Sequence, residues 1–230
     1  MKLIDELKEV GEPDRAKLLQ GFFKTGPGQY GEGDAFLGIP VPVTRKIAKK
    51  YRDLPFEKIE TLLENKFHEV RLAALLLLVH RYETGTNQEK QQVVDFYLNN
   101  TKRVNNWDLV DLSAHKILGA HLLHKDKSIL YHLAKSKNLW ERRISIIATA
   151  WFINKNQFED TIKISEILLH DKHDLIHKAV GWMLREVGKK NQEVLEHFLN
   201  KHYKTMPRTM LRYAIERFNE RKRQHYLKKS

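Results

Sequence analysis

The stretch VRLAALLLL, residues 70–78, places one polar side chain at the start of an apolar helix face, and this pattern recurs four more times. The other copies are VDLSAHKIL (110–118), RRISIIATA (142–150), HKAVGWMLR (177–185) and LRYAIERFN (211–219). The aligned polar residues are separated by 40, 32, 35 and 34 positions, which is the length of one pair of helices. Paired-helix repeats stack so that equivalent positions of their second helices recur along one concave groove. We therefore expect a curved helical array with a groove lined by Arg71, Asp111, Arg143, Lys178 and Arg212.

The rest of the chain agrees with an all-α fold. From Pro42 onward the apolar residues follow a helical period, and no stretch alternates as a strand would. Seven of the 11 glycines lie in the first 38 residues, mostly in KTGPGQYGEGDAFLGIPVP (24–42), where Gly and Pro prevent a regular helix. We predict one domain over residues 1–230, with amino-terminal helices and a Gly-rich loop over 1–41 and helical repeats over 42–230.

The composition limits the class of function. The chain has no cysteine, which excludes disulfides and thiolate chemistry and is typical of the reducing cytoplasm. The amino terminus lacks the apolar stretch of a signal peptide, and the longest apolar run, Leu72–Val79, is too short to cross a bilayer. We expect a cytoplasmic, nucleoid-associated protein of bacterial type that acts as a monomer and does not bind a membrane.

The net charge of +12 lies in the carboxyl-terminal half, since residues 1–100 are neutral and residues 201–230 hold ten basic and two acidic side chains. This polarisation favours a polyanion as the partner. A basic residue in such repeats also ties neighbouring repeats together by hydrogen bonds. Four basic residues in register favour phosphate contacts for at least two of Arg71, Arg143, Lys178 and Arg212.

Asp111 is the one acidic residue among the five aligned positions. A carboxylate that faces a polyanion weakens binding, so we expect Asp111 to have another function. Trp107 precedes Asp111 by four residues and Trp182 follows Lys178 by four, so both indoles lie on the face that carries the polar row. Core packing is the alternative for either indole. A carboxylate beside electron-rich indoles stabilises developing positive charge, as in hydrolysis of an N-glycosidic bond. An alkylated purine is already cationic and needs no second acid, so this single carboxylate suits it best.

Longer motifs carry a family resemblance. NNWDLVDLS (105–113), NLWERR (138–143), AVGWMLREVGKKN (179–191) and MPRTMLRYAIE (206–216), with FFKTGPGQYGEGDAFLGI upstream, resemble the AlkD-type alkylpurine DNA glycosylases. The resemblance implies a HEAT-like repeat fold that holds duplex DNA in its concave face and releases 3-methyladenine and 7-methylguanine type lesions without metal or cofactor. It also implies that Asp111 is catalytic, that Trp107 and Trp182 contact the lesion nucleotide, and that Arg143 holds the DNA backbone. Within the same motifs we expect further DNA contacts from Arg185 and Arg208.

One departure concerns the amino terminus, where Phe22 and Phe23 stand at the place of a tyrosine in certain relatives, so contacts from this region are not carried over. The sequence disfavours a metal site and leaves two other functions open. A metal site at His173 and His177, or at His121 and His124, lacks neighbouring ligands at the right spacing. A non-catalytic module could bind structured or branched nucleic acid through the same groove. The basic tail, residues 212–230, could bind an anionic membrane surface.

Overall fold

The computed structural model describes residues 1–228. These residues form two compact units, of which the first is Met1–Ser113 and the second begins at Ala114. Residues 229 and 230 of the predicted membrane-binding tail lie outside the described part. Within residues 1–228 there are helices and no strand of a sheet, apart from one isolated bridge between Ala35 and Phe67. The all-α prediction is therefore confirmed.

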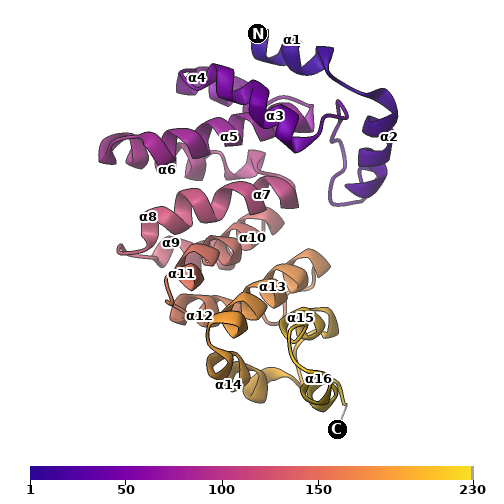
Figure 1. The fold of residues 1–230 in the computed structure, drawn as a ribbon, viewed down its shortest axis with the longest axis vertical. Coiled ribbons are helices and arrows are strands. Elements are labelled where there is room, and N and C mark those ends of the chain that lie inside the picture. The colour runs from indigo at the N-terminus through magenta and orange to yellow at the C-terminus, as the bar shows by residue number, and fades with distance from the viewer. Residues whose placement is uncertain (229–230) are drawn as a thin grey trace. The chain divides into compact units, whose positions relative to one another are not determined.

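The first unit is built around a long buried helix. Its elements are α1 (Lys2–Glu9), α2 (Pro13–Phe22), α3 (Val41–Ala48), η1 (Lys49–Tyr51), α4 (Phe56–Leu63), α5 (His68–Thr84), α6 (Asn87–Asn99), η2 (Thr101–Arg103) and most of α7 (Trp107–Ala114). Helix α5 packs against α3, α4 and α6, and α1 packs against α3 (Figure 1). The run Leu72–Val79 is buried throughout. This run is therefore the core of the unit.

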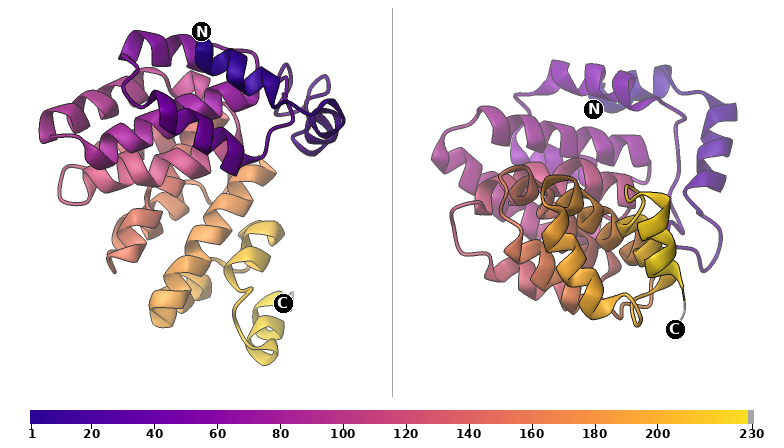
Figure 2. Two further views of the ribbon diagram at one scale, coloured as in Figure 1. Left: turned by 45° about the horizontal axis from the view of Figure 1, so that its top comes forward. Right: turned by 60° about the horizontal axis from the view of Figure 1, so that its bottom comes forward.

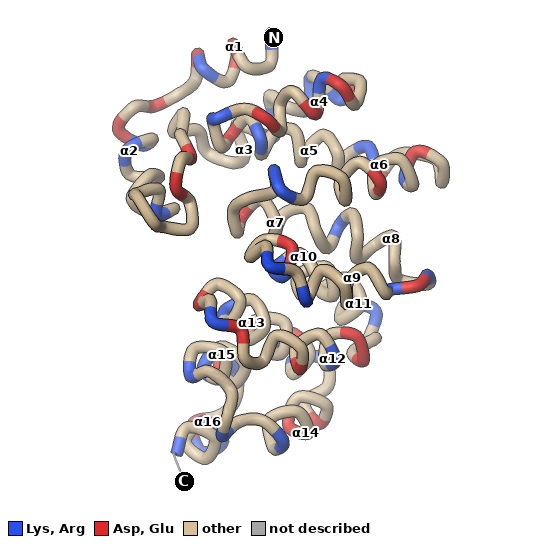
Figure 3. Tube along the Cα trace, turned by 180° about the vertical axis from the view of Figure 1, so that it is seen from behind, with Lys and Arg blue, Asp and Glu red and all other residues tan. Residues whose placement is uncertain are grey.

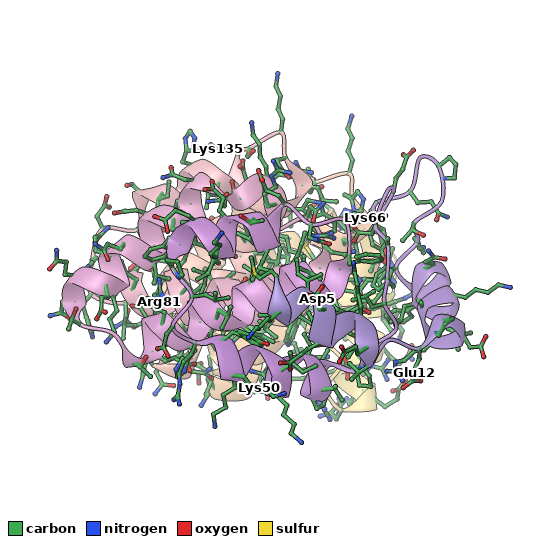
Figure 4. The ribbon with its side chains drawn as sticks, turned by 90° about the horizontal axis from the view of Figure 1, so that it is seen from above. Asp5, Glu12, Lys50, Lys66, Arg81 and Lys135 are labelled. Carbon is green, nitrogen blue, oxygen red and sulfur yellow. The ribbon has the colours of Figure 1, made fainter. Side chains whose placement is uncertain are left out.

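Helix α1 packs on the unit through its buried Leu3 and Leu7, and an ion pair also links it to η1. Seen from above, Lys50 lies near the first helices, and Asp5 and Glu12 mark α1 and the start of α2 (Figure 4). The Lys50 ammonium is 2.7 Å from the Glu6 carboxylate, and the Tyr51 hydroxyl donates to the same carboxylate at 2.5 Å. The hydrogen bond to Glu6 raises the pKa of Tyr51 to about 12. Helix α2, by contrast, has no buried residue.

The second unit contains three of the predicted repeats. Its elements are η3 (His115–Gly119), α8 (Ala120–Leu122), α9 (Ser128–Ala134), α10 (Leu139–Ala148), α11 (Ala150–Asn154), α12 (Glu159–Ile167), α13 (Asp174–Lys190), α14 (Gln192–His202), α15 (Arg208–Ala214) and α16 (Glu220–Leu227). Helix α10 packs on α9 and α13, and α13 packs on α14 and α15 (Figure 2). Second helices of successive repeats are therefore neighbours within this unit.

The repeat register agrees with the helices. The five aligned stretches begin in α5, α7, α10, α13 and α15, each of which follows a partner helix, namely α4, α6, α9, α12 and α14. After α7 the chain continues as a turn of π-helix, η3, for which the sequence gives no signal. No helix among the described residues is long and apolar enough to span a bilayer.

Candidate active site

Helix α7 carries the predicted carboxylate and one of the predicted indoles. Trp107 is its first residue and Asp111 lies one turn later, so both project from one face of α7, and both are partly exposed. Burial raises the pKa of Tyr97 far above its ordinary value, and the negative charge of Asp111 raises it further. Asp111 therefore lies close enough to the buried Tyr97 hydroxyl to act on it through its charge.

An aromatic cluster supports the indole of Trp107. The ring of Phe23 stacks on it at 5.2 Å between centroids, with 15° between the planes. Phe22 meets the same indole edge-on at 5.9 Å, and 64% of Phe22 is exposed, whereas Phe23 is buried. Sequence reasoning did not assign Phe22 or Phe23 to the site. Both residues lie more than 80 positions before Trp107 in the sequence, and the helical repeat pattern gives no signal for a contact over that separation.

Arg71, expected to contact phosphate, lies inside the first unit with 4% of its surface exposed. Its Nη2 donates to the Asp34 carboxylate at 2.5 Å, and its Nη1 donates to the carbonyls of Asn65 and Lys66 at 2.9 and 3.2 Å. Its Nε is also buried. The guanidinium thus links α5 to the Gly-rich segment, residues 24–42, and to the loop before α5. With so little of its surface exposed, Arg71 is not proposed as a DNA contact.

Arg143 takes a similar position in the second unit. It is 5% exposed, and its Nη1 donates to the Leu175 carbonyl at 2.6 Å, which links α10 to α13. The adjacent Arg142 makes the same kind of link through Asp171, at 2.6 Å. The backbone contact that the family resemblance implies for Arg143 stays a prediction.

Three other predicted DNA contacts of the second unit already have protein partners. Lys178, with 41% of its side chain exposed, pairs with Asp174 at 2.7 Å. Arg185 pairs with Glu216 and Glu186. Arg208 donates from Nη2 to the Leu227 carbonyl at 2.9 Å. Phosphate contact by these side chains would therefore replace interactions within the unit.

Trp182 and Arg212 are the remaining predicted residues. Trp182 lies one turn after Lys178 on α13 and is partly exposed. Arg212 is exposed on α15, and the Lys and Arg positions of α15 and α16 are visible in Figure 3. Trp107 and Asp111 are thus brought together on α7, while a hollow that they share with Trp182 stays a prediction.

The histidine pairs have local roles. His173 accepts a hydrogen bond from the Leu175 N–H at 3.1 Å and so caps the start of α13. His177 lies 2.5 Å from the Asp171 carbonyl oxygen, and His121 lies 2.8 Å from the Lys125 ammonium. Among the described residues no group of three or more His, Asp or Glu side chains is placed to hold a metal ion.

Comparison with known proteins finds a matching family model and similar solved structures. The family model described as DNA alkylation repair enzyme matches residues 3–218. In structure, the chain is similar to a predicted DNA alkylation repair enzyme from Enterococcus faecalis, with a TM-score of 0.70 and 20% identity over 91% of this chain and 97% of that chain. At this identity the structural likeness concerns the fold alone. No curated protein matches the chain. Because the family model covers most of the sequence, the chain belongs to the DNA alkylation repair enzyme family.

Proposed function

We propose that this protein is a DNA glycosylase of the AlkD type, which hydrolyses the N-glycosidic bond of cationic alkylated purines in duplex DNA. The proposal rests on two side chains of α7, Asp111 and Trp107. The partly exposed Asp111 carboxylate lies one turn from the Trp107 indole, on which Phe23 stacks. Membership of a DNA alkylation repair family supports the same assignment.

The chemistry follows from the charge of the substrate. As the bond between C1′ and the purine nitrogen breaks, its electron pair moves to the base and neutralises it, so the leaving group needs no proton. Positive charge develops on the sugar, and the Asp111 carboxylate stabilises that charge and orients a water molecule toward C1′. The water oxygen forms the new bond and releases one proton to Asp111 or to solvent. The indole of Trp107 attracts the cationic nucleotide.

Duplex binding is assigned to the basic side chains of the second unit. Lys178, Arg185, Arg208 and Arg212 lie on α13 and α15, two second helices that pack against each other. Trp182 shares α13 with two of these residues and is proposed as the second indole at the lesion. Contacts to phosphates hold DNA without regard to sequence, which suits an enzyme that must search all sequences for damage.

The substitution Asp111→Asn tests the catalytic assignment. It keeps the size of the side chain and removes its charge, so we expect base release from methylated duplex DNA to fall by about 10²-fold or more. Affinity for an undamaged duplex should stay equal or rise, because a repulsion between carboxylate and phosphates is lost. Released bases are measured by chromatography under single-turnover conditions, and affinity by fluorescence anisotropy.

Asp95→Asn serves as the matched control, since Asp95 is an exposed carboxylate on α6. This variant should release bases at the wild-type rate. Equal rates for wild type, Asp111→Asn and Asp95→Asn would remove Asp111 from the reaction. A wild-type protein that binds the duplex yet releases no base would support a non-catalytic nucleic-acid-binding module instead.

A further inference from the structure

His68, the first residue of α5, lies between two carboxylates that come from different parts of the first unit. Its Nδ1 is 3.2 Å from the Asp34 carboxylate of the Gly-rich segment, and its Nε2 is 2.8 Å from the Asp108 carboxylate of α7. The side chain is only 3% exposed. A neutral imidazole has one N–H, whereas the imidazolium has two and donates one hydrogen bond to each carboxylate.

The charges around His68 favour the imidazolium. Burial acts to lower the pKa of His68, but the hydrogen bonds to Asp108 and Asp34 outweigh burial and raise the pKa to about 9. Arg71, the nearby cation, opposes this increase and pairs with Asp34 at 2.5 Å. The pKa of Asp34 is lowered, because its hydrogen bond to His68 and the charge of Arg71 outweigh its own burial. The imidazole of His68 and the guanidinium of Arg71 thus lie between the carboxylates of Asp34 and Asp108 in one connected cluster.

This cluster holds the residues on both sides of Trp107. Asn106, which is fully buried, donates to Asp34 at 3.0 Å, and its side-chain oxygen accepts the backbone N–H of Trp107 at 2.8 Å. Asp108 is held by His68 and accepts the Leu109 N–H at 2.9 Å. The first turn of α7 is thus attached to Asp34 of the Gly-rich segment immediately before the indole, and to His68 of α5 immediately after it.

The same turn of α5 fixes the aromatic support of the indole. Glu69 accepts the backbone N–H groups of Leu37, Gly38 and Ile39 at 2.8–3.1 Å, which anchors the end of the Gly-rich segment. The His68 ring lies against Phe36 at 4.7 Å and Phe23 at 5.0 Å between centroids. Since Phe23 stacks on Trp107, His68 supports the indole through ring packing as well as through Asp108.

We propose that His68 is a positioning residue for excision, which sets the place of the Trp107 indole and of the α7 turn by bridging Asp34 and Asp108. The proposal rests on the proposed function, because only there does Trp107 meet a substrate. His68 itself is buried, so it acts through α7 and not by contact with the DNA. A deviation of a reacting group by about 1 Å can cost on the order of 10²-fold in rate.

The test compares His68→Gln with His80→Gln, because His80 lies on the same helix outside this cluster. A glutamine side chain carries no charge and cannot bridge both carboxylates as the imidazolium does. Hydrogen exchange, read by mass spectrometry, should become about tenfold faster or more in residues 24–38 and 104–112 of His68→Gln only. Single-turnover base release from methylated duplex should fall by about tenfold or more, with duplex affinity nearly unchanged.

Asp108→Asn is a second, milder variant. It tests the positioning role of His68 if His68→Gln does not fold. Wild-type base release should decline as the pH rises through about 9, and Asp108→Asn should move that decline to lower pH, which a merely structural contact would not do. Unchanged exchange in both variants, together with an unmoved pH profile, would overturn the proposal. The exchange measurement needs no substrate. A wild-type protein without base release would therefore refute the proposed function, while the exchange rates still decide whether His68 places Trp107.

Discussion

The indole of Trp107 is held on one side by protein, since Phe23 stacks on it and the adjacent residues 106 and 108 are anchored by the Asp34–His68 cluster. The spacing of Trp107 and Asp111 was predictable, because residues four apart in a helix share a face. The supports were not predictable. Asp34, His68 and Asp108 are separated by 34 and 40 positions and belong to no local pattern.

The raised pKa of His68 predicts how stability depends on pH. The pKa rises from an ordinary value of 6.5 to about 9, so the folded protein holds this proton more tightly than the unfolded chain does. The contribution of His68 is therefore full below pH 6.5 and is lost as the pH rises through about 9. An increase of this size corresponds to on the order of 3 kcal/mol in the free energy of unfolding.

Urea denaturation of wild type and His68→Gln at about pH 6 and about pH 10 checks this prediction. At about pH 6 the variant should have a lower free energy of unfolding than wild type. At about pH 10 this difference should be smaller, by most of the roughly 3 kcal/mol given above. Groups that do not interact with His68 titrate alike in both proteins and cancel in the comparison. A gap of equal size at the two pH values would show that His68 is not charged in the folded protein.

At the scale of elements, the close approach of α13 and α15 depends on Gly181. A Cβ added at this position would lie 2.5 Å from both the Met210 carbonyl oxygen and the Tyr213 Cβ. Gly181→Ala should therefore push the two helices apart and lower the free energy of unfolding by about 1–3 kcal/mol. Because both helices carry proposed DNA contacts, duplex affinity should weaken as well.

Gly21→Ala is the contrasting substitution, since a Cβ at Gly21 of α2 meets nothing within 4 Å. There alanine favours the helix and should leave stability unchanged or raise it by about 0.5–1 kcal/mol. Thermal unfolding separates the two variants. Equal melting temperatures for Gly181→Ala and wild type would mean that α13 and α15 are not packed as closely as described.

The buried side chains of Arg71 and Arg143 show what a local sequence pattern can and cannot predict. The repeat pattern predicted the helices that carry Arg71 and Arg143, because the 3.6-residue period is local. It did not distinguish a guanidinium that faces solvent from one that links two elements. The partners decide this, and they lie 37 residues away for Arg71 and 32 residues away for Arg143.

For the whole molecule, the net charge of +12 predicts DNA binding that weakens with salt. If about five phosphates are neutralised, the logarithm of the affinity should fall with a slope of about −4.5 against the logarithm of the salt concentration. Lys178→Gln and Arg212→Gln should each make the slope less steep by about 0.9. Titrations of a labelled duplex at several salt concentrations measure these slopes.

Lys163→Gln is the control, since Lys163 is 54% exposed on α12, a first helix of its repeat, and pairs with Glu159. It removes the same charge and should leave the slope unchanged. If all three variants shift the slope equally, general charge rather than a defined face would bind the DNA.

The proposed glycosylase activity is tested by chromatography of the bases that the wild-type protein releases from duplex DNA. The duplex carries both cationic methylated purines and a neutral lesion such as uracil. We expect release of 3-methyladenine or 7-methylguanine and none of the neutral base, because one carboxylate and an indole suit a leaving group that is already charged. Release of the neutral base at a similar rate, or of no base at all, would contradict this expectation.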